Sequence, residues 1–202
     1  MMKPVAEIQR LNRRIVFWQA YEPAVKTDLC AHAFLTPQGW VLVDPIPLGE
    51  GPLAELGREA ATAAIILTSA NHERAAGDLG KNAGVPVCAH ACAKGELSVG
   101  IDQWIEDGGQ VRGFTAIHLP GFAAGEIALH STDGQGTMMM GDALINLEPR
   151  GFSMLPDKYC AKPKVARKSL QKLLQFSFEV MTFAHGLPII AGARRRLEQL
   201  LQ

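Results

Sequence analysis

The stretches VLVD at residues 41–44 and IILTSANHER at residues 65–74 decide the fold. Each begins with a short apolar run, and short apolar runs bounded by polar residues are typical of buried β-strands. A helical pattern follows each of them, at residues 52–60 and 73–83. This alternation of strand and helix predicts βαβ units with parallel strands.

The rest of the chain adds antiparallel strands and further helices. Turn residues separate short runs that are rich in β-branched and aromatic side chains. The expected strands are residues 6–11, 14–21, 28–35, 39–43, 64–67, 86–89, 110–119, 126–131, 137–140 and 179–183, and further helices are expected at 164–175 and 188–202. Strands followed by βαβ units, twice over, predict two packed sheets with helices outside, an αββα sandwich of one domain over residues 1–202.

Composition excludes several classes of protein. The 202 residues carry 20 basic and 20 acidic side chains, so the formal net charge is zero and a nucleic-acid partner is not expected. No apolar stretch reaches the roughly 18 residues of a membrane-spanning helix, so no membrane association is expected. The N-terminal residues lack the apolar run of a signal peptide, and four cysteines do not form a disulfide framework. We therefore expect a cytoplasmic protein.

Five segments occur in an order and spacing that resembles the metallo-β-lactamase superfamily. In that family a strand ending in Asp precedes a T-H-x-H-x-D-H loop, a P-G-H turn, a G-D turn and a final G-H-G. The matching segments here are residues 41–44, 65–74, 119–122, 140–142 and 184–186. The resemblance implies the αββα metallo-hydrolase fold and a cleft that holds two metal ions.

Most of the metal ligands that the resemblance implies are replaced. The positions of the first metal hold Ser69, Asn71 and Phe122. Those of the second metal hold Glu73, Arg74, Asp142 and His185. A guanidinium stays protonated and cannot ligate a metal, so Arg74 brings a fixed positive charge to the place of a dication.

Two functional hypotheses follow. In the favoured one the site is vestigial, binds no metal and uses the old cleft for a small molecule, with Arg74 pairing the carboxylates of Glu73 and Asp142. In the alternative, one Zn, Mn or Fe ion is held by Asp142, His185 and either Glu73 or His72, and activates water for hydrolysis. Glu73 and His72 are then the candidate catalytic residues, although His72 needs a local shift of register.

Other residues carry weaker expectations. We expect His118 to line the same cleft as a structural imidazole, together with Ser69, Asn71, His72, Arg74 and Phe122. The resemblance gives Asp44 a supporting role beside the site. A zinc site at Cys88, His90 and Cys92 lacks a second cysteine pair, so buried thiols are expected there.

The segment at residues 147–162 borders the cavity by resemblance. It mixes aromatic, methionine and proline residues, which suit either a lid or a contact between two copies of the chain.

Overall fold

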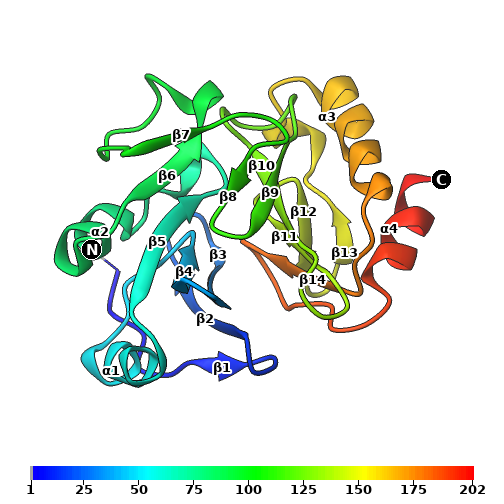
Figure 1. Cartoon of the computed structure of the whole chain (residues 1–202). Helices are drawn as coiled ribbons and strands as arrows, with labels where there is room; N and C mark the ends of the chain where they lie inside the picture. The colour runs from blue at the N-terminus through cyan, green and yellow to red at the C-terminus, as the bar shows by residue number, and fades with distance from the viewer. Residues whose placement is uncertain (1) are drawn as a thin grey trace.

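The computed structural model describes residues 2–202 and has four layers, with two β-sheets packed face to face between two pairs of helices (Figure 1). Helices α1 (Glu50–Glu59) and α2 (Ala76–Ala83) cover the first sheet. Helices α3 (Pro163–Leu170) and α4 (Ala193–Leu201) cover the second. The αββα prediction is confirmed. Within residues 2–202, no helix has both the length and the apolar character needed to cross a membrane.

The first sheet contains seven strands in chain order. They are β1 (Gln9–Arg10), β2 (Ile15–Glu22), β3 (Thr27–Thr36), β4 (Gly39–Val43), β5 (Thr62–Leu67), β6 (Val87–His90) and β7 (Gln103–Ile105). Pairing is antiparallel from β1 to β4 and parallel from β4 to β7. The parallel part places the carboxyl ends of β4, β5 and β6 at one edge of the sheet.

The second sheet has the order β14-β11-β10-β9-β8. Its strands are β8 (Gln110–Val111), β9 (Phe114–His118), β10 (Ile127–Ser131), β11 (Thr137–Met140) and β14 (Val180–Phe183). Strands β11 and β14 are parallel. A separate hairpin of β12 (Leu144–Leu147) and β13 (Gly151–Met154) lies beside this sheet (Figure 1). Single 3-10 turns are η1 (Ala70–His72), η2 (Ala91–Ala93), η3 (Asp157–Tyr159) and η4 (Gln171–Gln175).

Alternation along the strands divides the core into three layers. Val41 and Val43 of β4 point between the two sheets, whereas Leu42 packs under α1 and α2. In β11, Met139 points between the sheets and Met138 packs toward the second pair of helices. Both faces of each central strand are therefore buried, which explains why these strands are continuous apolar runs.

Several predicted elements differ in detail. Residues 110–119 form a hairpin, β8 and β9, because Arg112 and Gly113 turn the chain with positive φ angles of 50° and 91°. The last helix starts only at Ala193, since Ile189 forms a β-bridge with Met181. The helix expected at residues 73–83 starts at Ala76. Strands β7, β12 and β13 were not predicted, because each is short and lacks a clear alternation.

Candidate functional site

A group of polar side chains gathers where strands of both sheets end. Asp44 follows β4, and His72 lies in η1 beyond the end of β5. Asp142 follows β11, and His185 follows β14 of the second sheet. The two sheets thus contribute side chains to one place at their common edge.

His72, Asp142 and His185 form a compact set of three possible metal ligands. One carboxylate oxygen of Asp142, Oδ1, lies 3.1 Å from Nε2 of His72 and 3.1 Å from Nε2 of His185. Two donors that each lie about 2.1 Å from one ion are about 3.0–3.4 Å apart, so this spacing fits a shared cation.

The opposite nitrogen of each imidazole is anchored. Nδ1 of His72 lies 2.9 Å from the carboxylate of Asp44, and Nδ1 of His185 lies 2.9 Å from the carbonyl oxygen of Asp28. Both partners accept, so each Nδ1 donates its proton and each Nε2 faces Asp142. A lone pair facing a carboxylate requires a proton or a cation between them. Anchoring of the second nitrogen is the usual arrangement around metal-ligating histidines.

The carboxylate of Asp44 holds the imidazole of His72 in place. Its carboxylate accepts from the amide of Thr68 at 2.8 Å and from the Thr68 hydroxyl. Burial alone would raise the pKa of Asp44, but His72, Arg74 and the Thr68 hydroxyl together hold this pKa below its ordinary value. Burial lowers the pKa of His72, but the carboxylates of Asp44 and Asp142 outweigh it and raise this pKa to about 10. The positions of these groups agree with a supporting role for Asp44.

Glu126 is a buried carboxyl group that the sequence did not reveal. Its Oε1 accepts from the amide of Ala143 at 2.9 Å, and its Oε2 has no partner among the described residues. Burial and the charge of Asp142 raise the pKa of Glu126 to about 8, so it is mostly neutral at pH 7. Gly141 permits this close packing, because a Cβ there would lie 2.6 Å from Glu126 Oε1. Glu126 directly precedes the apolar strand β10, and no motif marked it.

Arg74 does not make the predicted pair with Glu73 and Asp142. Its Nη1 donates instead to the main-chain carbonyls of Cys30 and Asp44, at 2.7 and 3.0 Å. Arg74 adopts a positive φ of 40°, which turns its side chain away from the direction that a continuous helix from residue 73 would give. The guanidinium still lines the cleft and places a positive charge near Asp44 and Asp142.

The structure does not bring Glu73 to the other candidate ligands. Its carboxylate accepts from the amide and hydroxyl of Ser98 and from the amide of Val99, on the outer side of the turn. These bonds hold the pKa of Glu73 below its ordinary value. His72 lies beside Asp142 and His185 instead, which is the local shift of register that a role for His72 requires.

The positions that the resemblance gave to the first metal lie in three different environments. Ser69 is buried and its hydroxyl accepts from the amide of Asn71. Asn71 is exposed and lines the cleft. Phe122 is 2% exposed and packs in the apolar core under α3, so its ring belongs to the core and the neighbouring Ala123 lines the cleft.

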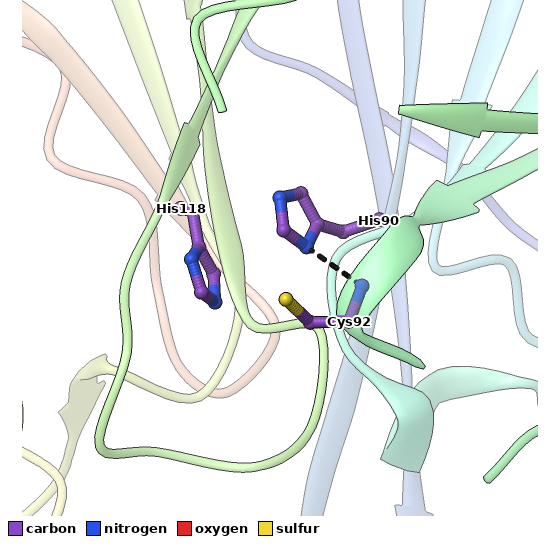
Figure 2. Close-up of side chains that lie close together, drawn as sticks. All are labelled: His90, Cys92 and His118. Carbon is purple, nitrogen blue, oxygen red and sulfur yellow. Dashed lines mark hydrogen bonds between the residues drawn. The ribbon is translucent and has the colours of Figure 1, made fainter. Parts of the chain in front are cut away.

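His118, expected in this cleft, lies elsewhere. It ends β9 and stacks on His90, the last residue of β6, with ring centroids 4.3 Å apart. Cys88 is buried as expected, but Cys92 is exposed because it lies in the turn after β6. His90, Cys92 and His118 form a second cluster of possible ligands (Figure 2).

A cleft of about 900 Å³ opens beside the first group. Its polar floor contains His72, Asp142 and His185, and Arg74 lies at its side. The turn between β2 and β3 forms one wall, and β12 with the segment after β13 forms the other. The apolar lining side chains are Ala24, Val25, Leu29, Ala123, Ile145, Leu147, Leu155, Pro156 and Tyr159. The expectation that residues 147–162 border the cavity is therefore confirmed for four residues of that segment, Leu147, Leu155, Pro156 and Tyr159.

A family model described as the metallo-beta-lactamase superfamily matches residues 8–202. The chain belongs to the metallo-beta-lactamase superfamily. A comparison with curated proteins found no match. Among solved structures, a metallo-beta-lactamase family protein, TTHA1429 from Thermus thermophilus, is 20% identical over 95% of this chain and 79% of that chain, with a TM-score of 0.70.

Two other solved structures show the same fold. TTHA1623 in a di-iron-bound form is 26% identical over 89% of this chain and 98% of that chain, with a TM-score of 0.65. A metallo-beta-lactamase from Hirschia baltica is 18% identical over 98% of this chain and 97% of that chain, with a TM-score of 0.72. This superfamily member therefore combines the shared fold with a group of possible metal ligands, His72, Asp142 and His185.

Proposed function

We propose that this metallo-beta-lactamase superfamily protein is a hydrolase that uses one metal ion held by His72, Asp142 and His185. The observation that carries the proposal is the convergence of two imidazole Nε2 atoms on one oxygen of Asp142, each at 3.1 Å. The sequence alone favoured a vestigial site because Arg74 and Phe122 stand at positions where the resemblance implies metal ligands. The placement of His72 supplies the missing third donor and favours the alternative.

The donor set limits the choice of metal. Two imidazoles and one carboxylate with open positions suit Zn(II), Fe(II) or Mn(II). One of the similar structures, TTHA1623, is described in a di-iron-bound form, which supports iron among the metals to be tested. When bound, such an ion lowers the pKa of a coordinated water and so supplies a nucleophile near neutral pH.

The protein's own groups prepare the site for this chemistry. Asp44 and the carbonyl of Asp28 hold the two imidazoles with Nε2 facing inward. Glu126, held mostly neutral by burial and by Asp142, adds little further negative charge behind the site. Arg74 offers a positive charge at the cleft wall, where a carboxylate or phosphate of a substrate would be attracted. The apolar walls suit a small molecule with a hydrocarbon part, and the proposed reaction is hydrolysis of an ester-type bond in it.

Metal analysis of variants tests the proposal. Protein purified without a chelator or a metal-affinity tag is loaded in turn with Zn(II), Mn(II) and Fe(II), and bound metal is measured by elemental analysis. We expect Asp142→Ala and His72→Ala each to lose one equivalent relative to the unmodified protein. The matched control is Glu73→Gln, which changes the adjacent carboxylate and should keep that equivalent.

Two results would refute the proposal. If Asp142→Ala and His72→Ala bind as much metal as the unmodified protein, the site is wrongly assigned. If Glu73→Gln loses the equivalent and His72→Ala keeps it, then Glu73 is the metal ligand and His72 is not. A loaded protein that passes this test is then screened against small carboxylic, thio- and phosphoesters, with Asp142→Ala as the inactive control.

A further inference from the structure

A second group of metal-binding side chains lies outside the cleft, at a junction between the two sheets. His90 is the last residue of β6 in the first sheet, and His118 is the last residue of β9 in the second. Cys92 lies in the turn η2 that follows β6. Figure 2 shows the two rings side by side with the sulfur of Cys92 next to them. None of the three is among the residues that line the catalytic cleft.

The spacing of the donor atoms is close to that of a metal centre. One nitrogen of each ring and the sulfur of Cys92 all lie within 4.8 Å of one another. Around a tetrahedral zinc ion, with bonds of about 2.0–2.3 Å, donors are about 3.3–3.7 Å apart. The donors therefore need to approach one another by about 1 Å. Cys92 is exposed and can rotate about its side-chain torsion without disturbing the core.

His90 presents one ring nitrogen, Nδ1, to Cys92. The residue is 2% exposed, and one ring nitrogen, Nδ1, accepts from the amide of Cys92 at 3.2 Å. The other ring nitrogen, Nε2, is buried and has no hydrogen-bond partner among the described residues. Because Nδ1 accepts, Nε2 carries the proton of the neutral ring, and Nδ1 holds the lone pair that would bind a metal in place of the Cys92 amide.

The two imidazoles are in the protonation state that a metal requires. Burial lowers the pKa of both His90 and His118, so the rings are neutral at pH 7 and each keeps a lone pair. Their nearly parallel stacking, with an angle of 19° between the ring planes, is compatible with two uncharged rings.

The surrounding charges favour a cation. Asp107 accepts from the amide of His118, and its other oxygen pairs with Lys172 at 3.0 Å, so that these two charges offset each other. Glu106 adds a further negative charge on the same side. A cysteine thiolate would contribute another, and binding of a divalent ion would then bring the group close to neutrality. The proton of the thiol leaves to solvent when the metal–sulfur bond forms.

We propose that His90, Cys92 and His118 bind a zinc-class ion, a borderline-soft divalent cation that accepts two imidazoles and one thiolate. This site is independent of the proposed hydrolytic centre and shares no ligand with it. Because its ligands come from strands of both sheets, the ion would join the two halves of the sandwich at this edge. A water molecule or a further ligand would complete four-fold coordination.

A cobalt and zinc titration of the full-length protein tests the second site. The starting variant is Asp142→Ala, which removes the first proposed site and is stripped of metal with a chelator. We expect it to bind one equivalent of Zn(II), and with Co(II) to show the thiolate-to-cobalt charge-transfer band in the near ultraviolet. Adding Cys92→Ser should abolish the band. Adding His118→Ala should weaken zinc binding more than about 100-fold, beyond the loss that a merely supporting residue causes.

Cys160→Ser in the same background is the matched control, because Cys160 is a partly exposed cysteine distant from the cluster in sequence. It should keep the band and the zinc equivalent. The proposal is overturned if the Asp142→Ala variant binds no zinc, or if the charge-transfer band survives Cys92→Ser. It is also overturned if the band disappears in Cys160→Ser. Failure of the first site is recognised separately, because Asp142→Ala would then bind as much metal as the unmodified protein.

Discussion

Replacing Asp44 with asparagine tests how strongly the charge of Asp44 stabilises protonated His72 in the metal-free protein. The substitution keeps the shape of the side chain, and asparagine tolerates the positive φ of 48° that Asp44 adopts. It removes the negative charge beside Nδ1 of His72, which lies 2.9 Å from the carboxylate. The imidazolium of His72 then has only Asp142 as a charged partner.

The magnitude follows from the pKa of His72. This pKa is raised from 6.5 to about 10, and each unit corresponds to about 1.36 kcal/mol, so protonation of His72 stabilises the metal-free fold by about 5 kcal/mol at most. Asp44 supplies the larger of the two raising charges, ahead of Asp142. We therefore expect Asp44→Asn to lower the free energy of unfolding by about 3 kcal/mol at pH 7.

The pH dependence gives a second readout. A raised pKa means that the stabilisation is complete below pH 6.5 and is lost as the pH rises toward 10. Urea denaturation of chelator-treated protein at several pH values from 6 to 10 should show a steady fall for the unmodified protein and a smaller fall for Asp44→Asn. The control is Asp133→Asn, which removes an exposed pair with Arg14 and should cost less than about 1 kcal/mol. Equal pH profiles for Asp44→Asn and the unmodified protein would refute the reasoning.

Three further variants probe the packing and charge around the site. Gly186→Ala should destabilise the fold and weaken metal binding, because Gly186 has a φ of 100° and a Cβ there would lie 2.0 Å from the carbonyl oxygen of Asn146. Normal metal affinity of this variant would contradict the expectation. Phe122→Ala should cost about 3–5 kcal/mol in urea denaturation without changing metal stoichiometry, since the ring is in the core and outside the cleft. Arg74→Met should lower stability by about 1–3 kcal/mol, because two carbonyls lose their donor. The same variant should raise metal affinity by about tenfold, because removing the charge of Arg74 relieves about 1.4 kcal/mol of repulsion with the metal ion. Unchanged affinity in a competition titration would contradict this expectation.

Local patterns in the sequence were sufficient for most of the architecture. Strand β4 and strand β11 were predicted with the bounds that the structure has, because their apolar runs end at clear turn residues. The hairpin at residues 110–118 was missed because a turn with a non-glycine residue at positive φ carries no strong local signal. The start of the last helix was placed too early because a long-range bridge between Met181 and Ile189 holds the preceding residues extended.

Only part of the candidate site could be predicted from local patterns in the sequence. Asp142 and His185 stand at motif positions, and the structure brings them together. The choice between Glu73 and His72 depends on the turn η1 and on the positive φ of Arg74, which together set the direction of each side chain. Rotation by one residue in a helical turn changes that direction by roughly 100–120°. Spacing alone therefore could not decide which of the two residues faces Asp142.

The amino-acid sequence by itself determined the layers of the sandwich, the order of the motifs and the presence of Ser69, Asn71 and Phe122 at positions where the resemblance implies metal ligands. These properties follow from hydrophobic periodicity and residue type, which act locally along the chain. Only the tertiary structure decided which donors meet: His72 with Asp142 and His185, and His90 and Cys92 with His118. The physical reason is that each group joins residues from different strands, so its geometry depends on how the two sheets pack together.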